Sequence, residues 1–455
     1  MPEKVSGGLP GGILHTLQNA AAVCLALVFV FTARNSDAAG KLPGEADEKA
    51  ADYSKEGFVV ERLVSRFVFE NDGTYSVVAT ARVRVQSQAG VQEFGMLKVA
   101  YPSATSMLDF TYIRVTKPDK RVVETPAENV LEMPAPITQA APFYSDLKEK
   151  QVAVKGLEID DTLEYEYRSV LKTPLDPGQF WLAFNFFSEG ICLQQDLQIS
   201  LPRGRAVKVE SSKVLPTMTD EGAYRVYTWK TANLESRSEK KDAKLVVPNE
   251  DLRPAVQISS FQNWDEVGKW FSGLLSSRIV PTPQIQAKAD ELTRNAKTDP
   301  EKIQAIYDFV STKFRYIGIA LGIGRYQPHA ATDVLSNDYG DCKDKHILFA
   351  ALLAAEHVNA YPALIGSTSK VDRDMPSPER FDHVITAIPQ GSGYLFLDTT
   401  PEVAPYGFLI ADLRDKEALV IPDHGPATLV RTPKDPPFKS TFNFQADGVL
   451  NDAGT

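Results

Sequence analysis

The sequence predicts an α+β protein in which an N-terminal antiparallel β-sandwich-like domain precedes a domain of helices and then strands. Three observations support this fold class. Short runs of alternating apolar and polar residues continue to about Leu234, and this rhythm is typical of sandwiches. A charged run, Glu235 to Lys244, then interrupts the strands. Helical spacing begins after Asn263 and strand patterns return from Tyr361, which is the segregated order of an α+β domain.

The 455 residues are enough for about three domains. We expect a signal peptide at residues 1–39, a β domain at 40–250, an α+β domain at 255–425 and the start of a truncated β segment at 426–455. Hydrophobic residues make up 43% and charged residues 24% of the chain, which is ordinary for soluble globular proteins. The net charge of −10 argues against a nucleic-acid-binding surface.

The N-terminus resembles an export signal. Lys4 precedes an apolar run from Ala20 to Thr32, and small residues suitable for cleavage follow at Ser36–Ala39. The run is shorter than the roughly 20 residues that a membrane-spanning helix needs, but it fits the apolar part of a signal peptide. We therefore expect an exported protein, periplasmic or extracellular. If the segment is not cleaved, it would tether the protein to the membrane.

Strand patterns dominate the next part of the chain. Residues Tyr75–Val85 alternate strictly, and Asn71-Asp72-Gly73 predicts a hairpin turn before them. In the helical part, Asn263 can cap a helix, and Asp299-Pro300 predicts the start of another, with Asp299 as its cap and proline at the first position. The glycine-rich segment Gly318–Gly324 does not join a strand to a helix in the manner of a phosphate-binding loop.

One stretch combines a tight turn with a single cysteine. Gly340 permits the turn, Asp341 is a good helix N-cap, and Asp344 lies three residues on, as in a capping box. Cys342 therefore lies in the first turn of a helix, where free N–H groups and the helix dipole favour a thiolate. Lys343 and Lys345 favour it as well, whereas Asp341 and Asp344 oppose it. The alternative is a small buried core cysteine.

A cysteine nucleophile needs a base and a group that orients the base. His383 begins a strand pattern, and Asp398 ends the next one. If the turn is centred between Gln390 and Gly391, the two residues oppose each other directly, with Cβ atoms about 4.5–5.5 Å apart. Such a pair would fix the tautomer of the ring and stabilise the imidazolium. The alternative is an exposed histidine that happens to lie near a strand-end aspartate.

Two other residues offer competing interpretations. His346 lies four residues after Cys342 on the same helix face and could form a dyad or half a metal site. No further ligand pair with zinc spacing is present, so we expect no metal, and a partly exposed helix residue is the simpler interpretation. Cys192 is interpreted as a core residue, although a Cys192–Cys342 disulfide would block catalysis by Cys342.

These motifs carry a resemblance to a known family. The motifs from Tyr316 onward resemble the bacterial transglutaminase-like superfamily. In the half before them, Val152–Tyr167 and Phe180-Trp181 are similar to DUF3857, a domain of unknown function that commonly precedes it. The motif residues are Tyr316, Gly322-Ile323-Gly324, Tyr326-Gln327-Pro328-His329, Gly340–Lys345, Phe381–Val384 and Leu397–Pro401. The resemblance implies a papain-like, transglutaminase-core α+β domain.

The resemblance also implies a Cys–His–Asp triad, with Cys342 as nucleophile, His383 as base and Asp398 as the orienting group. The backbone N–H of Cys342 would donate to the oxyanion, and Gln327 or Tyr326 would supply a second donor. The expected activity is exported, cofactor-free acyl transfer at amide bonds of a protein or peptide, with hydrolysis favoured over cross-linking. The rival interpretation is a binding or scaffold protein that keeps only the fold.

Overall fold

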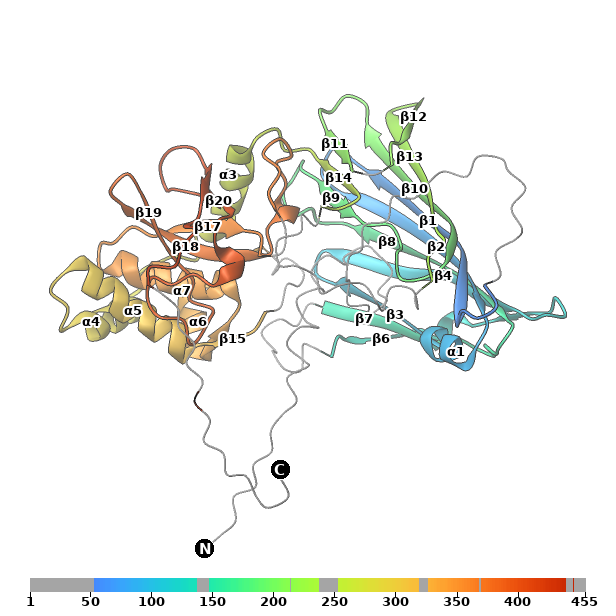
Figure 1. Ribbon diagram of the computed structural model, residues 1–455, viewed down its shortest axis with the longest axis horizontal. Coiled ribbons are helices and arrows are strands. Elements are labelled where there is room, and N and C mark those ends of the chain that lie inside the picture. The colour runs from blue at the N-terminus through green and yellow to red at the C-terminus, as the bar shows by residue number, and fades with distance from the viewer. Residues whose placement is uncertain are drawn as a thin grey trace, which may run out of the picture.

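The computed structural model describes residues 53–136, 147–212, 214–236, 253–318, 326–367, 370–438 and 445. The predicted signal peptide, most of the charged run after Leu234, most of the glycine-rich segment and nearly all residues after 438 lie outside the described residues. Within the described residues, no helix combines the length and apolar character needed to cross a membrane. The strands of the N-terminal half and the helices and strands of the C-terminal half form two adjacent groups (Figure 1).

The N-terminal half is built on a large twisted sheet. In spatial order its strands are β12 (Thr217–Glu221), β13 (Tyr224–Asn233), β10 (Cys192–Pro202), β1 (Phe58–Phe69), β2 (Tyr75–Val85), β8 (Thr162–Leu171), β4 (Ser106–Thr116) and β5 (Val122–Glu124). The predicted hairpin turn joins β1 to β2, where the Asp72 carboxylate accepts a hydrogen bond from the Thr74 N–H at 2.9 Å. One neighbouring pair, β1 and β10, is parallel. Alternation within a strand does not predict the direction of its neighbour, so the sequence could not show this exception.

Two small sheets cover one face of the large sheet (Figure 1). One contains β3 (Met96–Pro102), β7 (Leu147–Ala153) and β6 (Leu131–Pro134); the other contains β11 (Lys208–Ser211), β14 (Val256–Ser259) and β9 (Trp181–Phe184). The short elements α1 (Gln88–Phe94) and η2 (Ala127–Asn129) accompany the first. Each small sheet has its own core against the large sheet; Phe184 and Ile258, for example, pack with Phe67 and Trp229. This is the sandwich-like arrangement that the sequence predicts.

Helices open the C-terminal half. They are α3 (Trp264–Leu275), α4 (Pro283–Thr293), α5 (Asp299–Lys313), α6 (Ala331–Asn337) and α7 (Cys342–Ala355). Asn263 caps α3, as predicted, by accepting a hydrogen bond from the Glu266 N–H at 3.0 Å. The cap of α5 is Thr298 rather than Asp299. The prediction is wrong by one residue because the Thr298 hydroxyl and the Glu301 side chain form a reciprocal capping box.

A five-stranded antiparallel sheet completes this half. Its spatial order is β19 (Gly393–Leu397), β18 (His383–Gln390), β17 (Tyr361–Ile365), β20 (Glu417–Val420) and β21 (Thr428–Arg431), with η6 (Pro378–Arg380) and η7 (Ala411–Leu413) in its connections. A two-stranded parallel ladder joins β15 (Arg315–Tyr316) to β16 (Tyr339–Gly340). Helix α7 is buried on nearly all sides, and its Leu348 and Leu352 share a core with Val384 of β18. This packing brings Cys342 to the sheet that carries His383.

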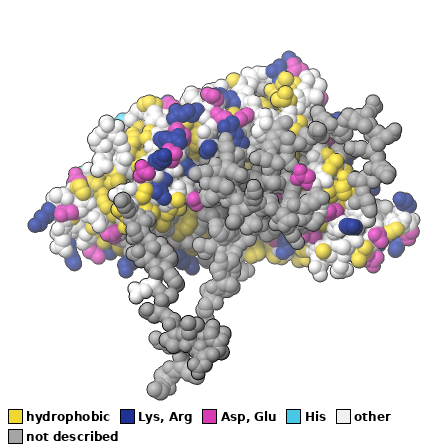
Figure 2. Space-filling view, in the orientation of Figure 1, with side chains coloured by type: hydrophobic (Ala, Val, Ile, Leu, Met, Phe, Trp, Pro, Cys, Tyr) yellow, Lys and Arg dark blue, Asp and Glu magenta, His cyan; other side chains and the backbone are white. Residues whose placement is uncertain are grey.

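Charged side chains are mixed on the surface that Figure 2 presents. Lys and Arg lie beside Asp and Glu there, and neither sign forms a separate field on this face. A surface of this kind offers no extended electrostatic attraction for a polyanion.

Candidate active site

Cys342 occupies the first position of α7, after a complete N-cap. The Asp341 carboxylate accepts hydrogen bonds from the N–H groups of Lys343 and Asp344, both at 3.1 Å, and Asp344 accepts one in return from the Asp341 N–H at 3.3 Å. This is the capping box that the sequence predicts. Cys342 is half-buried. Among the described residues, the Asp341 carboxylate accepts hydrogen bonds from the N–H groups of Lys343 and Asp344 but not from that of Cys342. The Cys342 N–H is therefore a donor at the N-terminal end of the helix.

Gly340 is required for a different reason from the one predicted. The residue of this turn with left-handed backbone geometry is Asp338, at φ 59°. At Gly340 an added Cβ would lie 2.6 Å from the Cβ of Asp344, so the absence of a side chain allows the buried Asp344 to approach.

We therefore expect Gly340→Ala to lower the free energy of unfolding by about 1–3 kcal/mol, because the capping turn must shift. Urea denaturation of the purified chain measures this. Gly393→Ala is the matched control, since no atom lies within 4 Å of its added Cβ, and its effect should stay within about 0.5 kcal/mol. Equal losses in both variants would contradict the close-approach explanation.

The two lysines next to the cap, Lys343 and Lys345, each interact with other groups of the protein. Lys343 forms a buried ion pair with Asp341. Burial, followed by the charge of Asp344, raises the pKa of Asp341 to about 6. Lys345 extends to the end of α5, where its Nζ donates to the carbonyls of Phe314 at 2.7 Å and Ser311 at 3.2 Å. Burial lowers the pKa of Lys345 to about 8. Lys345 is therefore engaged away from the thiol, whereas Lys343, although paired with Asp341, also interacts electrostatically with Cys342.

His383 and Asp398 come together by a register that differs from the predicted one. Gln390 pairs with Gly393, so the turn is centred between Gly391 and Ser392, one residue later than expected. His383 and Asp398 are therefore two residues out of direct opposition, and the predicted direct pairing is wrong. Because side chains alternate with a period of two, this shift preserves the face on which they lie. His383 Nε2 lies 3.0 Å from Asp398 Oδ2.

Asp398 is held from several directions. Its Oδ1 accepts hydrogen bonds from the Thr400 N–H at 2.9 Å and the Thr400 hydroxyl at 2.8 Å, and its backbone carbonyl accepts one from the Tyr307 hydroxyl at 3.0 Å. The side chain is 1% exposed. Burial raises the pKa of Asp398, but the interactions with His383 and Thr400 outweigh it, so that this pKa lies below its ordinary value. The carboxylate is therefore ionised and fixed in orientation.

The ring of His383 interacts with both the carboxylate and the thiol. Burial lowers the pKa of His383, but Asp398 and then Cys342 raise it well above its ordinary value. Because Nε2 faces Asp398, Nδ1 is the ring nitrogen available to Cys342. The structure thus brings Cys342, His383 and Asp398 to one place, from the start of a helix, the start of a strand and the end of the next strand.

Tyr316 also lies at the site, although the sequence alone indicated no chemical role for it. Its pairing with Gly340 in the β15–β16 ladder places it beside the cap of α7. Although Tyr316 is 37% exposed, the partial burial of its phenol, followed by the negative charges at Cys342, Asp341 and Asp398, raises the pKa of Tyr316 well above its ordinary value. The phenol therefore keeps its proton and can donate it. The only sequence signal was its place in the family motif.

The two predicted oxyanion donors lie in one loop. The ring of Tyr326 is buried and packs against Trp270 at 5.0 Å and Trp181 at 5.9 Å between ring centroids. Gln327 is half-buried. The loop is tied to the first turn of α7 because the His329 N–H donates to Asp344 Oδ1 at 2.8 Å. The packing of Tyr326 leaves Gln327 as the more accessible of the two.

His346 is not the partly exposed residue that the sequence suggested. It is 1% exposed, and its Nδ1 lies 2.8 Å from the Thr386 hydroxyl. Burial lowers the pKa of His346 to about 3, so the ring is neutral and links α7 to β18. The sequence could not show this because β18 packs on that side of the helix. Within the described residues, no group of three or more His, Cys, Asp or Glu could hold a metal ion.

The proposed disulfide alternative does not hold. Cys192 and Cys342 are both free cysteines. Cys192 is fully buried in the core of the N-terminal half, as predicted, and burial raises its pKa to about 12.

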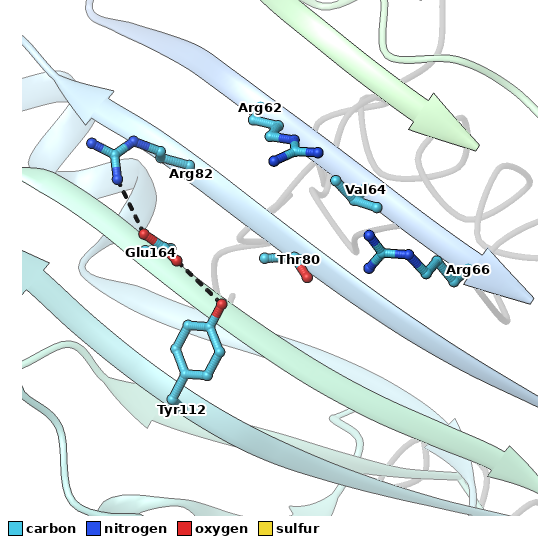
Figure 3. Close-up of a pocket in the computed structure, with 7 residues that line it drawn as sticks. All are labelled: Arg62, Val64, Arg66, Thr80, Arg82, Tyr112 and Glu164. Atoms are coloured by element: carbon cyan, nitrogen blue, oxygen red, sulfur yellow. Dashed lines mark hydrogen bonds and ion pairs between the residues drawn. The ribbon is translucent and has the colours of Figure 1, made fainter. Parts of the chain in front are cut away.

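A cavity of about 350 Å³ lies on the outer face of the large sheet, between β1, β2, β8 and β4 (Figure 3). It contains none of the predicted site residues. Glu164, one of its lining residues, accepts hydrogen bonds from Arg82 at 3.1 Å and Tyr112 at 3.2 Å. Arg62 is paired with Asp196 at 3.3 Å. We interpret this region as a cross-strand network of ion pairs on the solvent face of the sheet.

Comparisons with known proteins agree with this division of the chain. Residues 71–238 match the domain of unknown function DUF3857, and residues 286–364 match the transglutaminase-like superfamily. The second match includes Cys342 and ends before His383 and Asp398. No curated protein matches the chain.

Solved structures support the fold. The crystal structure of a proposed protease from Parabacteroides distasonis ATCC 8503 is similar at a TM-score of 0.67 and 16% identity, covering 84% of this chain and 72% of that one. At this identity the likeness concerns the fold alone. An M1 zinc metallopeptidase from Deinococcus radiodurans has a TM-score of 0.23 and 9% identity, covering 38% of this chain and 39% of that one, too low a similarity to carry an argument. The chain therefore carries a DUF3857 domain at residues 71–238, followed by a transglutaminase-like core at residues 286–364.

Proposed function

We propose that the protein is an exported cysteine-dependent enzyme that transfers the acyl group of an amide bond, with Cys342, His383 and Asp398 as its catalytic triad. The observation that carries the proposal is the contact of 3.0 Å between His383 and the buried Asp398, on a ring that also interacts with Cys342. A base oriented by a third group is the arrangement that activates a cysteine nucleophile. The transglutaminase-like core supports the reaction class.

The first half of the reaction forms a thioester. The thiol proton of Cys342 passes to Nδ1 of His383, and Asp398 stabilises the imidazolium that results. The thiolate attacks the carbonyl carbon of the amide, and the carbonyl oxygen becomes an oxyanion. The Cys342 N–H and the Gln327 side chain donate hydrogen bonds to this oxygen. The C–N bond then breaks, and the imidazolium returns its proton to the leaving amine.

The second half releases the acyl group. His383 takes a proton from water, and the resulting hydroxide attacks the thioester. The C–S bond then breaks to release a carboxylic acid, and the imidazolium of His383 returns its proton to the sulfur of Cys342. With an amine in place of water, the same steps form a new amide. We propose hydrolysis of a protein or peptide as the main reaction. Export rests on the N-terminal segment, which lies outside the described residues.

A thiol-reactive probe tests the proposal without knowledge of the substrate. Iodoacetamide should alkylate Cys342 at pH 6.5 at least about 10-fold faster in the wild-type chain than in His383→Gln, because an adjacent imidazolium favours the thiolate. Peptide mass spectrometry measures each cysteine separately. His346→Gln is the matched control, since that ring is buried and bonded to Thr386. Equal rates for Cys342 in wild type and His383→Gln would favour the alternative, a scaffold protein that retains only the fold.

A further inference from the structure

Two loops flank the candidate triad, and both reach the N-terminal half. The first, residues 326–330, carries Gln327 and is joined to the start of α7 through His329 and Asp344. The second, residues 370–382, directly precedes β18, which begins at His383. Loops hold functional groups in place only when a rigid scaffold supports them, so the contacts at their outer sides matter.

Trp181 of β9 contacts the first loop. Its ring lies 5.9 Å from the ring of Tyr326, edge to face, and 5.1 Å from that of Trp270. Trp270, from α3, in turn lies 5.0 Å from Tyr326. The three rings therefore form a closed set in which each contacts the other two. Tyr326 directly precedes Gln327, so this packing fixes the backbone that carries the predicted oxyanion donor.

Ser259 of β14 contacts the second loop. The side chain is fully buried, and its hydroxyl donates to the Pro376 carbonyl at 2.5 Å. The stretch Met375–Pro378 around this bond is buried as well. Lys208 of β11 adds a second contact through its Nζ, which donates to the Asp374 carbonyl at 2.9 Å. These contacts lie within nine residues of His383 along the chain.

Trp181 and Ser259 are opposed in the register of β9 and β14. One cross-strand pair of the N-terminal half therefore contacts both loops. The small sheet that carries the pair is packed on the large sheet through Phe184 and Ile258. Both loops are thus connected to the core of the N-terminal half.

We propose that the Trp181–Ser259 pair positions the two loops of the catalytic site, so that the DUF3857 half is a working part of that site rather than a separate recognition module. The inference rests on the proposed function. Trp181 and Ser259 are positioning residues here. Trp181 contacts Tyr326 and acts on Gln327 only through it. Ser259 contacts Pro376 and acts on His383 only through it.

The test measures alkylation of Cys342 by iodoacetamide as a function of pH in the full chain. Ser259→Ala removes the bond to Pro376, and Trp181→Phe reduces the contact with Tyr326. At pH 6.5 we expect the rate to fall about 10- to 100-fold in Ser259→Ala, because a small displacement of a catalytic group has an effect of this size. Above pH 9 this rate should converge with that of wild type, since an unassisted thiol is then largely ionised. Trp181→Phe acts on the oxyanion donor Gln327, and alkylation forms no oxyanion, so in this variant we expect hydrolysis of labelled casein to fall by a similar factor while alkylation keeps the wild-type rate.

Matched controls come from the same sheets. Ser211→Ala removes a hydroxyl of β11 that accepts a hydrogen bond from Trp229 at 2.9 Å, and Trp229→Phe changes a fully buried ring of the same core. Both should lower the melting temperature and leave the pH profile of Cys342 alkylation and the rate of casein hydrolysis unchanged. A profile or a hydrolysis rate that changes equally in controls and test variants would show a general structural effect and overturn the proposal.

Failure of this inference can be told apart from failure of the proposed function. If wild type and His383→Gln differ in alkylation at pH 6.5, but folded Ser259→Ala matches wild type in alkylation and folded Trp181→Phe matches it in casein hydrolysis, the positioning role is wrong and the triad stands. If wild type itself shows no dependence on His383, the proposed function fails, and the inference fails with it. If both test variants do not fold while both controls do, the pair is structural and the inference is wrong.

Discussion

Replacing Cys342 with alanine is expected to reduce amide hydrolysis by roughly 10³-fold or more, because without the sulfur no thioester can form. The residual rate would come from binding and oxyanion stabilisation alone. Release of fluorescent peptides from labelled casein measures hydrolysis, and a panel of peptidyl-glutamine amides measures release of ammonia. Incorporation of a fluorescent amine into casein reports acyl transfer to an amine.

Cys192→Ala is the matched control for this substitution. Cys192 is fully buried in the other half of the molecule, so its replacement should affect stability and leave turnover unchanged. Cys342 is half-buried, and Cys342→Ala should keep the wild-type melting temperature within a few degrees. A Cys342→Ala protein that retained wild-type hydrolysis would exclude the cysteine mechanism.

Asp398→Asn is expected to lower turnover by roughly 10⁴-fold, the effect seen when the orienting aspartate of a triad becomes an amide. The amide can still reach His383 Nε2, but it carries no charge to stabilise the imidazolium, and its N–H₂ group favours the wrong tautomer. The buried position of Asp398 makes the loss of charge more effective. Asp415→Asn, at an exposed carboxylate paired with Arg431 at 2.6 Å, is the control and should have wild-type activity.

The same variant has a signature in the titration of His383. Asp398 is the larger of the two interactions that raise the pKa of His383, so this pKa should fall in Asp398→Asn. Carbon-13 NMR of the histidine rings measures it, with His383→Gln to assign the signal.

In wild type, the raised pKa of His383 contributes stability that is full below pH 6.5, the ordinary value, and is lost as pH rises through the raised pKa.

The carboxylate contributes in the opposite direction. The lowered pKa of Asp398 adds stability that is present above 3.8, its ordinary value, and is lost as pH falls through the lowered pKa. Asp398→Asn should therefore flatten both ends of the dependence of stability on pH. An unchanged His383 titration in this variant would contradict the pairing of the two side chains.

Local signals in the sequence were enough for the start of α7. The cap needs only Asp341, Asp344 and the N–H groups between them, and these lie within four residues. The hairpin that carries His383 and Asp398 was also predictable from two alternating runs. Its exact register was not, because Gln390, Gly391 and Ser392 allow more than one turn position. The predicted register differed from the observed one by two residues. Because this number is even, His383 and Asp398 still lie on the same face of the hairpin.

Other features of the site depend on residues that are distant in sequence. Tyr316 pairs with Gly340 in the β15–β16 ladder, His346 is buried by β18, and Tyr326 packs against Trp181 from the other half. No short pattern contains both members of any of these contacts.

The sequence by itself determined the order of β half, helices and closing sheet, and it determined the cysteine, histidine and aspartate that we propose as catalytic. The reason is that caps, alternation and turns are set by side chains within a few residues of each other. The tertiary structure alone decided how the two halves meet, including the opposition of Trp181 and Ser259. It also decided that the side chain of Lys345 reaches the end of α5 and not the thiol of Cys342. Such contacts depend on packing between distant segments, which no local pattern specifies.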